Sequence, residues 1–261
     1  MQDGYEIYGG FASVYDIFMD NIPYDEWFAY VKGLLERQDI CDGIVAELAC
    51  GTGEMTWRLA EAGYSMIGVD ISEDMLVVAR EKCDPEVLLL HQDMRELDLY
   101  GSVSAMICVC DGMNYICEEE DLQKVFEKVY AFLEADGVFI FDMKTDYFYR
   151  EVLGNRTITD NRENASYIWE NEYHEDEQLN EYLLTVYELV DDEQDLFVRT
   201  DELHYQKAYV PEVVTQLLKK SGFSGVEVFE AFTVHAPSED CERLYFIAHK
   251  ENENGKNSAG L

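Results

Sequence analysis

A short segment of this chain, Val45 to Gly53, constrains its fold more than any other. Its sequence, VAELACGTG, is an apolar run that contains Glu47 and ends in a Gly-x-Gly turn, and a second apolar run ends at Asp70. Glycine in such a turn allows positive φ angles and lets a bound molecule approach the backbone. A carboxylate at the end of the next strand can accept hydrogen bonds from two ribose hydroxyls. The pattern is typical of a nucleoside-binding α/β unit.

The turn differs from a dinucleotide fingerprint at one position. That fingerprint requires a third glycine where this chain has Thr56. Glu47 lies just before the turn, where a carboxylate would repel a pyrophosphate and could instead help to hold an ammonium group. An NAD-dependent oxidoreductase is therefore the less favoured alternative.

The middle of the chain predicts a parallel sheet. Amphipathic helical patterns separate five apolar runs that are predicted strands, at 45–48, 66–70, 87–90, 103–110 and 138–141. Strands that alternate with helices form parallel sheets with right-handed crossovers. Two further predicted strands, Val226 to Val234 and Leu244 to His249, form an antiparallel edge. We therefore expect an α/β fold with a Rossmann-like, mostly parallel seven-stranded sheet and helices on both faces.

Residues 146–207 follow a different pattern. Apolar and aromatic side chains alternate there with polar ones, as in Tyr182, Leu184 and Val186. Alternation with a period of two predicts an antiparallel sheet, which would be inserted after the fifth strand as a β cap. Two roles for the β cap stay open: it could cover an acceptor pocket, or it could pair two copies of the chain as a homodimer.

These patterns divide the chain into four parts. Tyr8, Phe11, Ala12 and Tyr15 recur at helical spacing near its start. The prediction is an N-terminal helical segment at 1–42, a main domain formed by 43–145 and 208–250, the β cap at 146–207, and a disordered tail at 251–261.

The charge of the chain limits its partners. The formal net charge is −36 over 261 residues. Nonspecific nucleic-acid binding depends on Lys and Arg side chains that meet phosphates, so we expect no binding to nucleic acids or to anionic membranes. Solubility is the favoured explanation of the charge, and attraction of cationic substrates is the alternative.

Cysteine and histidine usage indicates a cytoplasmic protein without a metal site. The seven cysteines form no C-x-x-C motif, and several lie in predicted buried strands, which is typical of reduced cysteines. The five histidines show no metal-ligand spacing. Neither a signal peptide nor an apolar run of membrane-spanning length is predicted.

A series of motifs resembles the class I S-adenosylmethionine-dependent methyltransferases. In chain order they are Tyr8-x-x-Phe11-Ala12-x-x-Tyr15-Asp16, Cys50-Gly51-Thr52-Gly53, Gly68-Val69-Asp70-Ile71-Ser72 with Met75-Leu76, Gln92-Asp93-Met94, and Asp111-x-x-Asn114-Tyr115. The resemblance is to the small-molecule branch, which includes sugar N,N-dimethyltransferases and glycine N-methyltransferase-like enzymes. It implies S-adenosylmethionine as the cofactor, a small-molecule acceptor, and methylation of nitrogen or oxygen.

The same resemblance implies a set of cofactor-binding residues, namely Glu47, Ala49, Gly51, Gly53, Asp70, Ile71, Met75, Asp93, Met94 and Cys110. Glu47 would reach the ammonium group of the cofactor, and Asp70 would bind the ribose hydroxyls. Ile71 would pack on the adenine, and Asp93 would contact its amino group with Met94 beside it. Ile71 and Met94 could instead belong to the core, and Asp93 could cap a helix.

The acceptor side is less defined. Methyl transfer from a sulfonium is a direct displacement with an activated leaving group, so the enzyme mainly supplies alignment and desolvation. The candidate catalytic residues are Tyr15, Asp111 and Asn114. His91 and His204 are weak candidates for a general base, and an ordinary structural role is favoured for both. A protein that binds the cofactor without turnover is a further alternative, because this chemistry needs few named groups.

Overall fold

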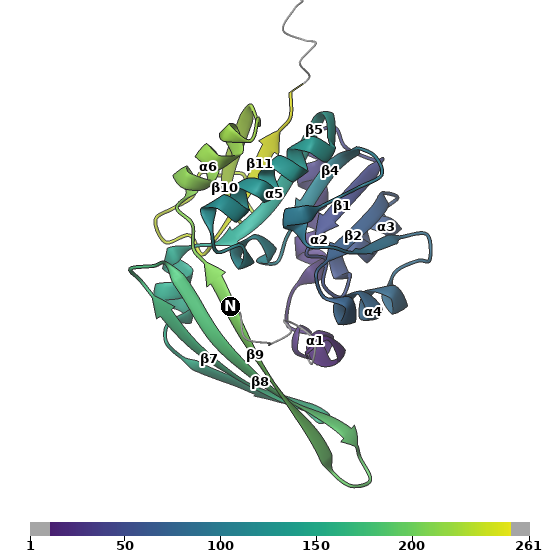
Figure 1. The fold of residues 1–261 in the computed structure, drawn as a ribbon, viewed down its shortest axis with the longest axis vertical. Helices are drawn as coiled ribbons and strands as arrows, with labels where there is room; N and C mark the ends of the chain where they lie inside the picture. Colours follow the sequence, from purple (N-terminus) through teal and green to yellow (C-terminus); the bar gives the residue numbers. More distant parts are fainter. Residues whose placement is uncertain (1–10, 252–261) are drawn as a thin grey trace, which may run out of the picture.

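The computed structural model of the 261-residue chain describes residues 11–251. The helical pattern at Tyr8 and all but the first residue of the predicted tail lie outside the described residues. Figure 1 shows a large sheet flanked by helices and a separate antiparallel sheet that projects away from it.

The large sheet has seven strands in the order β10-β11-β5-β4-β1-β2-β3. Strands β1 to β5 pair in parallel, and β11 runs antiparallel between β10 and β5. The predicted fold class is therefore confirmed. The strands are β1 (Ile44–Leu48), β2 (Ser65–Asp70), β3 (Leu88–His91), β4 (Val103–Cys108), β5 (Leu133–Lys144), β10 (Gly225–Glu230) and β11 (Arg243–His249).

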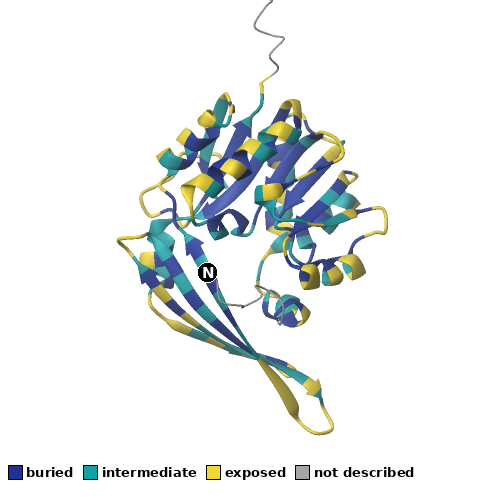
Figure 2. Cartoon of the chain, viewed as in Figure 1, coloured by how far each residue is buried: buried dark blue, intermediate teal, exposed yellow. Residues whose placement is uncertain are grey.

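Helices cover both faces of this sheet (Figure 1). Leu122 and Phe126 of one helix pack on the strand face that carries Leu48 and Phe141. The strands are therefore buried on both sides, which explains their nearly continuous apolar sequences (Figure 2). The helices around the large sheet are α2 (Tyr24–Arg37), α3 (Glu54–Glu61), α4 (Glu73–Lys82), α5 (Glu119–Phe132) and α6 (Pro211–Lys220), with 3-10 turns η1 (Met94–Glu96) and η2 (Gly112–Tyr115).

The inserted sheet has four antiparallel strands in the order β6-β7-β8-β9. They are β6 (Thr157–Asn161), β7 (Ala165–His174), β8 (Leu179–Asp191) and β9 (Leu196–Lys207), and a short π-helix, η3 (Phe148–Leu153), precedes them. The short N-terminal helix α1 (Ala12–Phe18) packs its aromatic face on this sheet, where the rings of Phe18 and Tyr167 are 4.8 Å apart.

Two local expectations were wrong. The alternating pattern predicted from residue 146 begins as a strand only at Thr157, because η3 comes first. The strand predicted at 138–141 begins earlier, at Leu133, so that Gly137 lies inside β5, and α5 already ends at Phe132. A Cβ at Gly137 would come within 3.0 Å of the carbonyl oxygens of Glu134 and Ser104, so this glycine permits close approach of two backbone segments.

Candidate functional site

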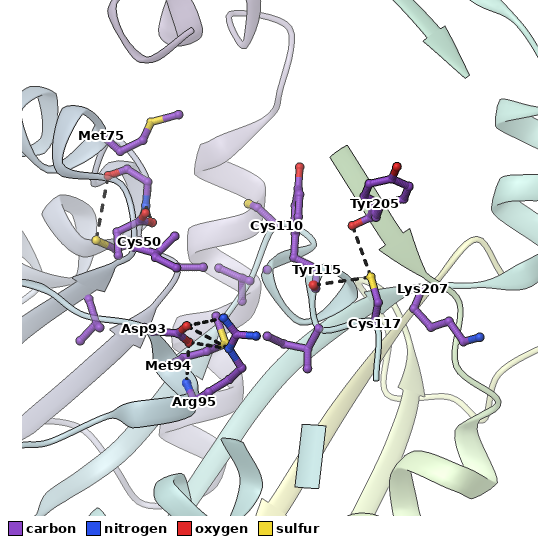
Figure 3. Close-up of a pocket in the computed structure, with 18 of the residues that line it drawn as sticks. Cys50, Met75, Asp93, Met94, Arg95, Cys110, Tyr115, Cys117, Tyr205 and Lys207 are labelled. Carbon is purple, nitrogen blue, oxygen red and sulfur yellow. Dashed lines mark hydrogen bonds and ion pairs between the residues drawn. The ribbon is translucent and has the colours of Figure 1, made fainter. Parts of the chain in front are cut away.

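A cavity of about 830 Å³ opens at the carboxyl ends of β1, β2 and β4. Strand β1 pairs with both β2 and β4, so the strand order reverses direction at this point. Open α/β sheets bind ligands at such switch points. Figure 3 shows that Asp93 and Arg95 lie at one end of the cavity and Tyr115, Tyr205 and Lys207 at the other.

The glycine turn shapes the floor of the cavity. Ala49, Gly51 and Gly53 have positive φ angles of 53°, 52° and 78°. A Cβ at Gly51 would meet no atom within 4 Å, and Gly51 lines the cavity, so the missing side chain leaves open space for a ligand. A Cβ at Gly53 would lie 3.1 Å from Ala79 and Cys83. Gly53 is absent from the cavity wall and allows α4 to pack closely.

Asp70 is held at the end of β2 by two backbone groups. Its carboxylate accepts hydrogen bonds from the N–H groups of Gly51, at 2.8 Å, and Ser72, at 2.9 Å. Its burial raises the pKa, although these backbone donors act in the opposite direction. The two bonds fix the side chain on the wall of the cavity, where a ribose could share the carboxylate.

Glu47 is a second buried carboxylate on the cavity wall. It is 2% exposed and accepts a hydrogen bond from the hydroxyl of Thr56, the residue that replaces the third glycine of the dinucleotide fingerprint. Burial, with the nearby charge of Asp70 adding to it, raises the pKa of Glu47 to about 8. Among the described residues, no cationic side chain contributes to this pKa. A ligand ammonium group would supply the missing charge, so this pocket fits such a group.

The remaining cofactor candidates surround the same space. Ile71 lines the cavity and is 54% exposed, so it does not belong to the core. Met94 lines the cavity and also packs against a core cluster. Met75 and Cys110 complete this part of the wall.

Asp93 has two structural roles beside the cavity. Its carboxylate accepts a hydrogen bond from the backbone N–H of Arg95 at 2.9 Å and caps η1. It also forms a two-point ion pair with the guanidinium of Arg95, which lowers the pKa of Asp93. Asp93 therefore acts as a cap and still lines the cavity, where an adenine could lie.

Asp111 and Asn114 do not form part of the cavity wall. Asp111 forms ion pairs with Lys144, at 2.7 Å, and with Arg243, which also pairs with Asp142. These two cations lower the pKa of Asp111 to about 2, against the effect of its burial. The carboxylate of Asp111 is thus held in a buried cluster of ion pairs and does not line the cavity.

The side chain of Asn114 is completely buried and links three segments. Its amide donates to the backbone carbonyls of Lys144, at 3.2 Å, and Lys207, at 2.8 Å, and accepts from the N–H of Lys144 at 3.0 Å. Asn114 thereby joins η2 to β5 and to the end of β9. It positions the acceptor end of the cavity without reaching into it.

The comparisons with known proteins agree with this geometry. Residues 45–137 match the family described as a methyltransferase domain. The protein named "Putative methyltransferase YqeM" of Bacillus subtilis (strain 168) is 36% identical over 247 residues, or 94% of this chain and 97% of that protein. The solved structure of a S-adenosylmethionine-dependent methyltransferase from Clostridium acetobutylicum ATCC 824 has a TM-score of 0.80 and 26% identity, over 94% of this chain and 99% of that chain. The dTDP-3-amino-3,6-dideoxy-alpha-D-glucopyranose N,N-dimethyltransferase of Streptomyces fradiae is 28% identical over 134 residues, or 51% of this chain and 52% of that protein.

The chain belongs to the S-adenosylmethionine-dependent methyltransferases. The recognition made from its motifs is confirmed, and so is S-adenosylmethionine as the cofactor. The methyltransferase fold and the buried carboxylate of Glu47, which would repel a pyrophosphate, also argue against a dinucleotide enzyme.

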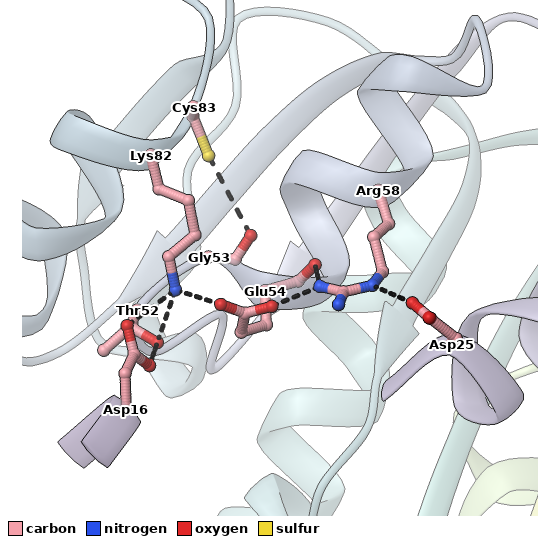
Figure 4. Close-up of polar contacts among 8 residues, drawn as sticks. All are labelled: Asp16, Asp25, Thr52, Gly53, Glu54, Arg58, Lys82 and Cys83. Atoms are coloured by element: carbon pink, nitrogen blue, oxygen red, sulfur yellow. Dashed lines mark hydrogen bonds and ion pairs between the residues drawn. The ribbon is translucent and has the colours of Figure 1, made fainter. Parts of the chain in front are cut away.

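The N-terminal helix of the methyltransferase closes one side of the site. Tyr15 of α1 and Tyr24 of α2 line the cavity. Asp16 of α1 accepts hydrogen bonds from the Thr52 hydroxyl in the glycine turn, at 2.7 Å, and from Lys82 of α4, at 2.8 Å. Figure 4 shows how these contacts continue through Glu54, Arg58 and Asp25. The network attaches α1 to the turn that forms the cavity floor.

Several residues at the acceptor end of the methyltransferase were not among the candidate catalytic residues Tyr15, Asp111 and Asn114. Tyr115, Tyr205 and Lys207 line the cavity, and so does the turn between β7 and β8 at residues 176–179. Tyr115 comes from η2, whereas Tyr205, Lys207 and residues 176–179 belong to the β cap. The hydrogen bond between Asn114 and Lys207 joins these two parts across 93 positions of the chain. Tyr115 belongs to the motif Asp111-x-x-Asn114-Tyr115, so the sequence already pointed to it. No local pattern could have identified Tyr205, Lys207 or residues 176–179, because only the folded β cap brings them to the cavity.

Two features are absent from the described residues. Within residues 11–251, no helix is both long and apolar enough to cross a membrane. The described segment contains no group of three or more His, Cys, Asp or Glu side chains that could hold a metal ion.

Proposed function

We propose that this methyltransferase transfers a methyl group to a nitrogen or oxygen atom of a small molecule that binds beneath the β cap. One observation carries the proposal: a single cavity extends from Glu47 and Asp70 to Tyr115, Tyr205 and Lys207. Cofactor and acceptor could therefore occupy one enclosed space, and enclosure supplies the alignment and desolvation that a displacement reaction needs.

S-adenosylmethionine supplies an activated methyl group. In this proposal Glu47 binds its ammonium group, the open backbone at Gly51 adjoins the methionine part, and Asp70 binds the ribose hydroxyls. Ile71 and Met94 pack beside the adenine, and Tyr15 covers the site from α1.

Two observations support an amine as the acceptor. The Streptomyces fradiae relative is named as an N,N-dimethyltransferase of an amino sugar derivative. The acceptor end of the cavity also carries Glu118, Asp176 and Glu177, whose negative charges would attract a protonated amine from solution.

Pairing of two copies through the β cap stays a prediction.

A turnover assay tests this proposal. S-adenosylhomocysteine formation would be measured with a panel of amino sugars, small amines and hydroxylated analogues of the same compounds. We expect turnover with at least one amine, loss of that turnover in Asp70→Ala, and normal turnover in Asp74→Ala, whose side chain is exposed on α4. Cofactor binding without turnover of any compound would instead favour a binding protein.

A further inference from the structure

A chain of buried polar groups connects the β cap to the cavity. Glu202 and His204 lie two positions apart on β9 and are 1% and 0% exposed. Tyr115 stands at the end of η2 and lines the cavity. None of these three side chains has a role in binding the cofactor described above.

The contacts in this chain are sequential. Oε2 of Glu202 lies 3.1 Å from Nε2 of His204, and Nδ1 of His204 lies 3.4 Å from the hydroxyl of Tyr115. The other oxygen of Glu202 accepts the N–H of Phe11 at the start of α1, at 3.1 Å. The backbone of Phe11 therefore fixes the carboxylate of Glu202 at the far end of the chain.

Tyr182 of β8 holds the histidine ring in place. The two rings are stacked, with centroids 4.6 Å apart and planes inclined by 7°. The hydroxyl of Tyr182 also forms a hydrogen bond with the hydroxyl of Tyr115. The imidazole is thus constrained by stacking on one side and by hydrogen bonds at both nitrogen atoms.

The donor directions follow from the chemistry of the groups. A carboxylate can only accept hydrogen bonds, so Nε2 of His204 carries the proton that it shares with Glu202. In neutral imidazole the other nitrogen then has a lone pair, and Nδ1 accepts from the Tyr115 hydroxyl. Of the groups in this chain, Tyr115 lines the cavity, whereas Tyr182, His204 and Glu202 do not, so Tyr115 is the member that a bound acceptor can contact.

We propose that Tyr115 is the catalytic residue that accepts the proton of the acceptor, and that His204 and Glu202 are positioning residues that make this transfer possible. This inference rests on the proposed methyltransferase function and assigns it a general base. It also assigns a class of acceptor, namely a group whose N–H or O–H faces the hydroxyl of Tyr115.

The proton balance of the reaction supports this assignment. The acceptor atom forms its bond to the methyl carbon with its own lone pair, while the electrons of the broken S–C bond stay on sulfur. The acceptor must then lose its N–H or O–H proton to become neutral. That proton moves to Oη of Tyr115 as the hydroxyl proton of Tyr115 moves to Nδ1 of His204. The negative charge of Glu202 compensates the imidazolium. When the product leaves, the proton on Nδ1 of His204 returns to Tyr115, and Tyr115 releases one proton to solvent.

A purely structural role is the competing explanation. Tyr182 and the neighbouring aromatic residues form a core between α1 and the β cap, and buried histidines often only satisfy polar neighbours. The two explanations differ in two measurable properties: the tautomer of His204, and the effect of the Tyr115 hydroxyl on the turnover number.

The first test is nuclear magnetic resonance of the full chain, labelled with ¹⁵N-histidine and saturated with S-adenosylhomocysteine. We expect the His204 signal, identified by its loss in His204→Gln, to show a protonated Nε2 and an unprotonated Nδ1. Tyr115→Phe should shift the Nδ1 resonance, and Tyr187→Phe, which alters a tyrosine of β8 outside this chain of groups, should not. A proton fixed on Nδ1 would overturn the inference.

The second test is kinetic and uses the acceptor found in the turnover screen. Tyr115→Phe should lower kcat by about 100-fold or more, because general base catalysis contributes roughly 10²–10⁴-fold. The KM and Kd for S-adenosylmethionine should change by less than about threefold. His204→Gln should also lower kcat, and His174→Gln, on β7, serves as its matched control. If His204→Gln does not fold, the nearly isosteric Tyr115→Phe still decides the question.

The outcomes separate this inference from the proposed function. Failure of the proposed function would appear as no turnover by the unaltered protein with any acceptor. Failure of this inference would appear in an active enzyme, as an unchanged kcat in Tyr115→Phe or as a larger loss of cofactor affinity than of kcat. A selective loss of kcat, together with the expected tautomer, supports the assignment.

Discussion

Glu47 shows how burial of a single residue makes stability depend on pH. Its folded pKa of about 8 lies above the ordinary value of 4.5, so the folded protein holds a proton that the unfolded chain releases between these pH values. Linkage then requires the free energy of unfolding to fall as pH rises through this window.

We predict that the difference in unfolding free energy between the unaltered protein and Glu47→Gln changes with pH. From pH 5 to pH 8 the unfolding free energy of the unaltered protein should fall relative to that of Glu47→Gln, because glutamine does not titrate. Urea denaturation of both proteins without cofactor, at three pH values, measures this difference. A constant difference across the range would contradict the account.

Arg243 stabilises two buried carboxylates, those of Asp111 and Asp142. We predict that Arg243→Met lowers the free energy of unfolding by about 3–5 kcal/mol, since it leaves buried charge unpaired. Arg37 makes a half-exposed ion pair with Glu227, and Arg37→Met should cost less than about 1 kcal/mol. Chemical denaturation compares the two variants, and equal losses would show that the buried cluster has no special role.

The residues of the site differ in how far sequence could predict them. Glu47 and Asp70 belong to a local motif whose spacing places both near one turn, and the structure brings both to the cavity. The environments of Asp111 and Asn114 depend on Arg243 and Lys207, which lie far away in the chain. A local sequence pattern could therefore not predict that Asp111 and Asn114 make structural contacts.

The surroundings of His204 could also not be predicted from the sequence. In the sequence it is an ordinary histidine in an alternating strand pattern. Only the pairing of the β cap with α1 and η2 places it between Glu202 and Tyr115. Long-range packing, not residue type, gives this histidine a candidate role.

At the scale of elements, polar contacts attach α1 to the glycine turn at the floor of the cavity, in addition to its apolar packing on the β cap. Asp16 accepts hydrogen bonds from Thr52 and Lys82. We predict that Asp16→Ala speeds dissociation of S-adenosylhomocysteine roughly tenfold, because a charge-assisted hydrogen bond contributes about 1.5–3 kcal/mol. Stopped-flow fluorescence measures this rate, and the exposed Glu26→Ala on α2 is the control. An unchanged rate would mean that α1 does not retain the cofactor.

Elements with strong periodicity were the most predictable. The parallel strands were visible as apolar runs because both sheet faces are buried, and β7 to β9 were visible through their alternation. The π-helix η3 has no comparable signature, and neither does the packing of α1 on the β cap rather than on the main sheet. Both depend on tertiary contacts that a local pattern does not carry.

At the scale of the whole molecule, the net charge of −36 opposes folding through self-repulsion. Salt screens exposed charges over about 10 Å at 0.1 M ionic strength. We therefore predict that the melting temperature rises by a few degrees between 20 and 300 mM NaCl, as scanning calorimetry would show. A fall in the melting temperature would indicate that attractive ion pairs such as Lys82–Glu54 outweigh the repulsion.

The most direct test of the account is calorimetric titration of the protein with S-adenosylmethionine, S-adenosylhomocysteine and NAD. The account predicts micromolar binding of the first two and none of NAD. It also predicts at least a 100-fold loss of affinity in Asp70→Ala and no significant change in Asp74→Ala, which alters an exposed residue of the neighbouring helix. Equal affinity in the Asp70 and Asp74 variants, or preference for NAD, would contradict the assignment of this cavity as the cofactor site.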